Sequence, residues 1–239
     1  MTWREAEIAF RRVPVAVLAT GSTEQHGPMG EIGTDTFCAA AIAREAAARA
    51  GAIVLPPLAY TPAPFNMGFR GTLSLPPTLF AATVSAICEG LATHGVRGLF
   101  VVNGHGANLA PLHTVAEGAP LRLKVRSWWD FDGVAPLRAT FGAHEGMHAT
   151  PSEISITMAL HGQRPVPAEA ASPPTPLPDG FIAAHAGDRH GPPEAHRAAF
   201  PDGRVGSHSA LASADMGKAL LEAASAGAAR EIEAFARTV

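Results

Sequence analysis

The side chains best suited to bind a metal ion or to move a proton stand in a few short polar segments. Glu24 and His26 lie within the segment Gly21–Pro28, and Asp35 follows shortly after it. Glu24 and His26 are two residues apart, so they point the same way if that segment is extended. Mixed carboxylate and imidazole donors suit zinc, manganese or iron. The residue types therefore indicate a transition-metal site.

A glycine-rich turn, Asn103–Asn108 (NGHGAN), supplies a further histidine, His105. Its glycines let the backbone turn tightly, and its histidine and asparagines offer donors and acceptors. Such a turn could also cradle a phosphate, but its spacing matches neither GxGxxG nor GxxxxGK[ST]. We therefore expect His105 to be a ligand beside Glu24 and His26.

The segment His144–His148 (HEGMH) fits the HExxH signature of zinc proteases. That mechanism needs both histidines on one face of a helix. The residues that follow predict otherwise, because Thr150, Pro151 and Glu153 form a capping box with a proline in the first turn. The helix should begin at about residue 150, which leaves HEGMH in the preceding loop.

Two of the acidic residues also have a purely structural explanation. Asp35 opens a predicted helix, where a carboxylate is held favourably by free amide groups. The Glu153 carboxylate can return to the Thr150 amide as part of the capping box. For Asp35, its place beside Glu24 and His26 favours a ligand role, and for Glu153 both explanations stay open at this point.

Short β-rich runs alternate with longer helical runs along the chain. Strands are predicted over 13–19, 52–58, 98–102 and 121–128, and helices over 36–50, 77–94, 109–117, from about 150 to 160, and over 213–237. This alternation predicts an α/β fold with right-handed crossovers and a mostly parallel sheet covered on both faces. Ligands bind at the carboxyl ends of such strands, and that is where Glu24, His26 and His105 fall.

Length and composition favour one domain with a sizeable core. The chain has 239 residues, of which 47% are hydrophobic. We expect a single domain over 1–239, with an irregular loop region at about 164–210 that is rich in Pro, Gly, Ala and His. The net charge is −3, without a basic block, which argues against a general nucleic-acid binder.

The sequence also predicts a cytoplasmic protein. It contains no apolar run long enough for a transmembrane helix, and residues 1–12 lack the apolar core of a signal peptide. The cysteines, Cys38 and Cys88, lie fifty residues apart without a CxxC, which argues against a zinc ribbon or a disulfide framework.

Taken together, the motifs resemble the creatininase family (creatinine amidohydrolase and its relatives). The matching segments are 21–28 (GSTEQHGP), 33–36 (GTDT), 103–108 (NGHGAN) and 148–155 (HATPSEIS), with a weaker echo at 206–208 and 213–217. Their order and spacing match the family from about residue 13 to residue 160. The resemblance implies a three-layer αβα sandwich with a mostly parallel central sheet and a dinuclear metal centre at the strand ends.

The resemblance also implies a role for each matching side chain. Glu24 and His105 would hold one metal ion and His26 the other. Asp35 would bridge the two ions. His148 matches the family's catalytic histidine. The implied cofactors are two divalent metal ions, zinc first, with manganese or iron as the alternatives.

One departure from the family pattern concerns the second metal. At the glycine-rich turn, creatininase itself has a sequence that resembles NGHYEN. The Glu of that sequence completes its second metal site. This chain has Ala107 at that position. Relatives with an NGHGGN-type turn use the Glu of the later HAxxxE motif, which is Glu153 here. We therefore expect Glu153 to be a ligand, and an activity other than that of strict creatininase.

The predicted function is metal-dependent hydrolysis of a C–N bond in a small cyclic amide or formamide, through a metal-bound hydroxide at a dinuclear centre. His148 would pass a proton to the leaving nitrogen. The expected partners are a small-molecule amide and further copies of the chain in a homo-oligomer, with a hexamer implied by the family, but neither nucleic acid nor membrane. The alternatives are a metal-dependent peptidase that processes a modified peptide or cofactor precursor, and a non-catalytic metal-binding scaffold of the same fold.

Overall fold

The computed structural model describes residues 1–187 and 189–239 and contains a four-stranded parallel sheet in the order β2-β1-β3-β4. The strands are β1 (Val15–Thr20), β2 (Ile53–Val54), β3 (Gly98–Asn103) and β4 (Arg122–Ser127). Val15 pairs with Gly98, and Gly98 pairs with Arg122, so three strands begin in register. They also end together, which brings the segments after β1, β3 and β4 to one edge of the sheet.

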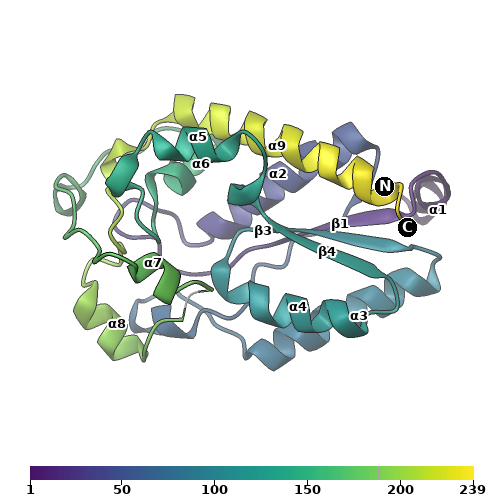
Figure 1. Cartoon of the computed structure of the whole chain (residues 1–239), viewed down its shortest axis with the longest axis horizontal. Coiled ribbons are helices and arrows are strands. Elements are labelled where there is room, and N and C mark those ends of the chain that lie inside the picture. The colour runs from purple at the N-terminus through teal and green to yellow at the C-terminus, as the bar shows by residue number, and fades with distance from the viewer. Residues whose placement is uncertain (188) are drawn as a thin grey trace.

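Helices cover both faces of this sheet (Figure 1). The helices are α1 (Trp3–Arg12), α2 (Thr34–Ala50), α3 (Pro77–Thr93), α4 (Leu109–Gly118), α5 (Val134–Ala139), α6 (Pro151–His161), α7 (Phe181–Ala184), α8 (Pro193–Ala199) and α9 (Ala214–Ala236). Val17 packs with residues of α2 and α9, whereas its neighbour Leu18 packs with residues of α3 and α4. The alternation of side chains along a strand thus supplies both cores, and the predicted αβα sandwich is confirmed.

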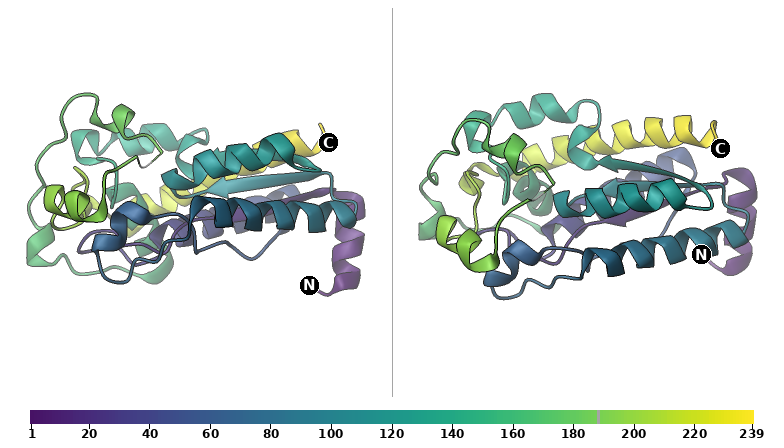
Figure 2. Two further views of the ribbon diagram at one scale, coloured as in Figure 1. Left: turned by 90° about the horizontal axis from the view of Figure 1, so that it is seen from below. Right: turned by 60° about the horizontal axis from the view of Figure 1, so that its bottom comes forward.

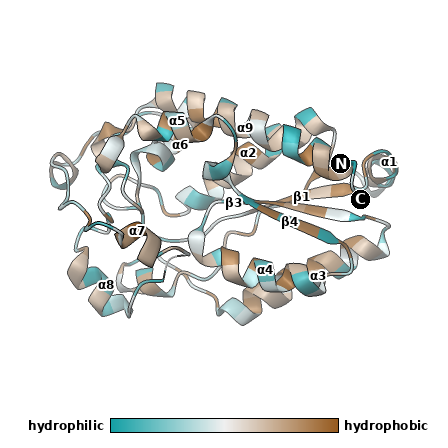
Figure 3. Cartoon of the chain, viewed as in Figure 1, coloured by the Kyte–Doolittle hydropathy of each residue, from teal (hydrophilic) through white to brown (hydrophobic). Residues whose placement is uncertain are grey.

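Burial of the central strands explains why the strand predictions were reliable. Every residue of β1 and β3 is buried, and Figure 3 shows hydrophobic residues along the strands and on the helix surfaces that meet them. A strand covered on both faces reads as a continuous apolar run. Cys38 on α2 and Cys88 on α3 are fully buried in these two cores.

The structure differs from the sequence predictions mainly at the edges of the fold. The strand predicted over 52–58 is reduced to β2, because Pro56 and Pro57 cannot donate ladder hydrogen bonds. Helix α1 was not predicted, although Thr2 and Glu5 form a capping box at its start. The irregular region at about 164–210 contains α7 and α8 and lies beyond the carboxyl ends of the strands, while α1 lies at the opposite end (Figure 2).

Within the described residues, no helix is both long enough and apolar enough to cross a membrane.

A close crossing between α6 and α9 depends on Gly217. A Cβ atom at this position would lie 1.8 Å from the backbone oxygen of Ser155. We expect Gly217→Ala to lower the free energy of unfolding by about 3 kcal/mol, because the helices would have to move apart. Gly90→Ala on α3 is the matched control, since its Cβ would meet nothing within 4 Å; it should raise stability by about 0.5–1 kcal/mol. Equal effects of the two substitutions in urea unfolding would contradict the close-packing explanation.

Candidate metal centre

Two glycines let the loops after β1 and β3 approach the start of α2. A Cβ at Gly21 would lie 2.2 Å from the backbone nitrogen of Thr36. A Cβ at Gly104 would lie 2.4 Å from the backbone oxygen of Asp35. Because neither position leaves room for a side chain, the two loops meet Asp35 at close range.

All six side chains predicted to form the site converge at this edge of the sheet, and all six are buried. Their potential ligand atoms form three overlapping groups, each within 4.8 Å: Glu24, Asp35 and His105; His26, Asp35 and Glu153; Glu24, His26 and His148. Asp35 belongs to the first two groups. Ala107 lies in the turn 106–108 and has only a methyl side chain, whereas Glu153 completes a group.

The two oxygens of Asp35 face different histidines. Oδ1 lies 2.9 Å from His26 Nε2, and Oδ2 lies 3.0 Å from His105 Nδ1. Glu24 Oε1 lies 3.2 Å from the same His105 nitrogen. The Ser22 hydroxyl donates to Asp35 Oδ2 at 2.8 Å and holds that carboxylate in place. Asp35 is therefore the side chain that joins the two halves of the cluster.

Backbone carbonyls orient the histidine rings. His105 Nε2 lies 2.7 Å from the Pro62 oxygen, and His148 Nε2 lies 2.7 Å from the Gln25 oxygen. We assign the N–H to these nitrogens, since a carbonyl can only accept. The Nδ1 atoms of both rings then face carboxylates, where each can hold either a proton or a metal ion. Histidines that bind metal ions are commonly fixed by such a bond from their other nitrogen, so the arrangement fits a metal site.

The buried charges shift one another's protonation. Burial alone would lower the pKa of His26, but the carboxylates of Asp35, Glu153 and Glu24, with Asp35 contributing most among them, together raise that pKa to about 10. Burial likewise opposes charge on Asp35, yet His26 and His105 hold the pKa of its carboxyl well below the ordinary value. The pKa of His105 is raised well above its usual range because Glu24 and Asp35 overcome the effect of burial. The carboxylates of the cluster thus favour the protonated, positively charged forms of His26 and His105.

The position of Glu153 is compatible with both roles that the sequence left open, helix capping and metal binding. Its Oε2 accepts a hydrogen bond from the Thr150 amide at 2.9 Å, and the capping box at the start of α6 is complete. Burial raises the pKa of its carboxyl to about 7, with Asp35 adding to the rise and His26 opposing it. One carboxylate can therefore cap the helix and face the cluster.

The donor set as a whole fits divalent cations. Glu24, Asp35 and Glu153 are three buried carboxylates. Among the described residues, Glu24 and Asp35 pair with histidines of the cluster, and none of the three pairs with a lysine or an arginine. Buried carboxylates are normally paired or bound to metal ions. Oxygen and imidazole nitrogen donors in this mixture suit zinc, manganese or iron.

Sequence reasoning missed the residues that support this cluster from a distance along the chain. Asn66, in the turn 64–68, donates to Glu24 Oε2 at 2.9 Å. The Gln25 side chain in turn donates to Asn66 Oδ1 at 2.9 Å. Gln25 lies inside the recognised segment, but nothing in the local pattern around Asn66 signals contact with a residue 42 positions away.

The HEGMH motif lies outside any long helix, as predicted. A short 3₁₀ turn covers 142–144, His144 is exposed, and α6 begins only after Thr150. His148, by contrast, is buried, and its backbone pairs with Val205, at the edge of the weakly matching segment 206–208. Ala149 beside it has a positive φ of 57°, a conformation that alanine rarely adopts outside constrained sites.

A pocket of about 280 Å³ opens beside the cluster. Its wall includes Asp35, His105, His148 and Glu153, and Trp128 and Trp129 form part of its apolar side. Both tryptophans follow β4 directly and line the pocket, although Trp128 is also part of the core. The cluster therefore faces an enclosed space suited to a small molecule.

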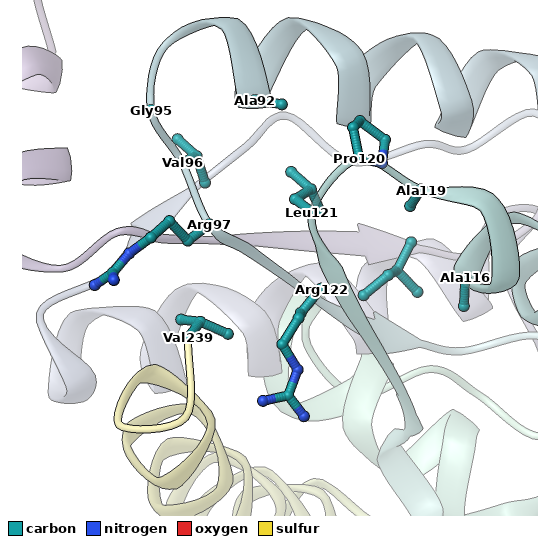
Figure 4. A pocket seen from close by; sticks show the side chains of 11 residues that line it. Ala92, Gly95, Val96, Arg97, Ala116, Ala119, Pro120, Leu121, Arg122 and Val239 are labelled. Atoms are coloured by element: carbon teal, nitrogen blue, oxygen red, sulfur yellow. The ribbon is translucent and has the colours of Figure 1, made fainter.

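A larger hollow, of about 750 Å³, lies at the opposite end of the sheet (Figure 4). Arg97, Leu121, Arg122 and Val239 line it, where β3 and β4 begin. Every group of potential metal ligands in the described ranges lies at the carboxyl ends instead. We therefore assign the chemistry to the smaller pocket.

Comparison with known proteins identifies the family to which the chain belongs. A family model described as creatininase (creatinine amidohydrolase) matches residues 1–232. The chain belongs to the creatininase family. The predicted resemblance is thereby confirmed.

Two curated relatives illustrate the range of this family. Creatinine amidohydrolase of Pseudomonas putida is 32% identical over 150 residues, which cover 55% of this chain and 56% of that protein. The mycofactocin precursor peptide peptidase of Mycobacterium ulcerans is 30% identical over 169 residues, covering 64% of this chain and 65% of the relative. Each match thus spans less than two thirds of the relative's length.

Solved creatininase structures share the fold over nearly the whole chain. A mutant creatininase of the Zn-Zn type has a TM-score of 0.75 and 25% identity, covering 98% of this chain and 96% of that one. A creatininase described with Mn has a TM-score of 0.69 at the same identity and coverage. Creatininase-family structures thus include forms named for either metal.

Proposed function

We propose that this member of the creatininase family is a metal-dependent amidohydrolase whose two metal sites share Asp35. The observation that supports this most directly is that Asp35 belongs to two groups of potential ligands, with its two oxygens turned toward different histidines. Glu24 and His105 would complete one site, and His26 and Glu153 the other. When bound, two divalent ions would lower the pKa of water and polarise a substrate carbonyl.

His148 would serve as the proton-transfer residue. It lines the pocket, and its Nδ1 lies 3.7 Å from Glu24 Oε1. Its Nε2 is committed to the Gln25 carbonyl, so Nδ1 is the nitrogen that can exchange a proton. A histidine held this way can pass a proton to the leaving nitrogen of a C–N bond.

The pocket supports a small substrate, such as a cyclic amide or a formamide. Its volume of about 280 Å³ lies below the range of roughly 300–1,000 Å³ that accommodates drug-sized ligands. Zinc is our first choice of metal, with manganese or iron as alternatives, because the donors are mixed nitrogen and oxygen. We further propose a cytoplasmic homo-oligomer, which the family implies; exposed Trp3 and Ile8 on α1 offer apolar surface for contacts between copies.

The second candidate is a peptidase that processes a modified peptide, since one relative carries that name. Ile182, Ala186 and Gly187 line the pocket from the α7 segment, so a peptide would need this segment to lie farther away. We expect zinc-loaded protein to hydrolyse members of a panel of small cyclic amides and formamides, and to leave short peptides of four to eight residues intact. Cleavage of peptides alone would replace the amidohydrolase assignment with the peptidase.

A further inference from the structure

The pocket contains one cationic side chain that the proposed hydrolysis does not use. Arg138, on α5, lines the same pocket as Asp35, His105, His148 and Glu153, and no other lysine or arginine among the described residues does so. Trp128, Trp129 and Ile182 are its apolar neighbours in that wall. A partly buried positive charge is normally paired, and among the described residues Glu145 is the anion that pairs with Arg138.

The Nε edge of the Arg138 guanidinium is held by Glu145. Its Nε donates to Glu145 Oε1 at 2.7 Å, and the Ser152 hydroxyl donates to the same oxygen. The guanidinium carbon lies 5.8 Å from the centre of the Trp128 ring. Ser152 directly precedes Glu153 at the start of α6. The contacts that hold Arg138 therefore lie beside one of the potential metal ligands.

The other edge of the guanidinium is available. Glu145 engages only Nε, and no described residue accepts a hydrogen bond from the two terminal amino groups of Arg138. Arg138 lines the pocket, and its side chain is 28% exposed. Two parallel N–H groups match the two oxygens of a carboxylate.

We propose that Arg138 binds a carboxylate of the substrate, so that the substrate class is a small amide bearing a carboxylate group. That the substrate is an amide rests on the proposed function, whereas the carboxylate is inferred from Arg138. A singly charged carboxylate fits better than a phosphate, because one arginine, already shared with Glu145, offers limited positive charge. Arg138 and members of the cluster line the same pocket, so a ligand that fills it can contact both.

The proposal is tested with matched pairs of probes that differ by a carboxylate: 5-oxoproline with 2-pyrrolidinone, and N-formylglycine with N-methylformamide. Binding to zinc-loaded protein is measured by calorimetry, without any requirement for turnover. We expect the carboxylate member of at least one pair to bind at least tenfold more tightly than its partner, and Arg138→Gln to reduce that ratio below twofold. Arg138→Lys should retain an intermediate ratio, since it keeps the charge but loses the fork.

Arg126→Gln is the matched control. Arg126 lies on β4, pairs with Glu231 and does not line the pocket, so the wild-type ratio should persist. Loss of Arg138 alone leaves Glu145 without its cation, which could impair folding. The double variant Arg138→Gln/Glu145→Gln removes both charges and should show the same loss of carboxylate preference.

The outcomes separate this proposal from the proposed function. A wild-type protein that prefers the carboxylate member of no pair overturns the role of Arg138, and so does an unchanged ratio in both the single and the double variant. Tight, Arg138-dependent binding of carboxylates with no hydrolysis of any amide would support the role of Arg138 while contradicting the amidohydrolase.

Discussion

Asp35→Asn is expected to abolish binding of both metal ions and, with it, hydrolysis. Its two oxygens lie 2.9 and 3.0 Å from nitrogens in different halves of the cluster, so no other residue can substitute for both contacts. Asparagine preserves the shape but removes the charge and one of the oxygens. Mutation of a residue that only orients a metal ligand typically lowers metal affinity about 10–100-fold. Because Asp35 would itself be a ligand, we expect zinc affinity to fall at least about 100-fold. Equilibrium dialysis against zinc, followed by elemental analysis, measures it.

Asp215→Asn provides a control with the same chemical change. Asp215 lies in the first turn of α9, is almost fully exposed, and pairs only with Lys218 among the described residues. It should keep both metal ions and full activity. If Asp35→Asn retained two equivalents of metal and the wild-type rate, the bridging role would be wrong.

Glu153→Gln separates the metal role of this residue from its capping role. Glutamine can still accept the hydrogen bond from the Thr150 amide, so the melting temperature should change little. Its neutral amide is a poor metal ligand, so the protein should fall from about two equivalents of metal to about one. Because the second ion would be lost, we expect activity to drop by at least about 100-fold. Elemental analysis and a rate measurement on the same preparation check both effects.

Thr150→Ala should show the opposite pattern. The Thr150 hydroxyl caps α6 by accepting from the Glu153 amide at 3.1 Å, and losing such a cap costs about 1 kcal/mol. Metal content should stay at two equivalents, because Thr150 belongs to none of the ligand groups. A Glu153→Gln variant that lost stability but kept both ions would assign the residue to capping alone.

The sequence predicted the parts of the fold whose signals are local. Buried strands such as β1 read as apolar runs, and the end of α2 is marked by Gly51, which has the expected left-handed conformation. Helix α1 was not predicted although two local signals mark it: its capping box, and the spacing of Trp3, Ala6 and Phe10 on one face.

Topology predicts the placement of the site residues that follow strands, and the motifs and the family resemblance supplied Asp35, His148 and Glu153. Glu24, His26 and His105 stand just after β1 and β3, so topology alone brings them together. Asn66 reaches the cluster from a turn, and Arg138 reaches the pocket from a short helix after β4. Their contacts depend on how loops fold back over the strand ends, which no local spacing encodes.

The central claim is that this chain carries two metal ions held around Asp35. Elemental analysis of protein purified without a chelator or a metal-affinity tag tests it most directly. We expect about two equivalents of zinc, manganese or iron per chain. One equivalent, or none after reconstitution with excess zinc, would contradict the dinuclear centre and the hydrolysis built on it.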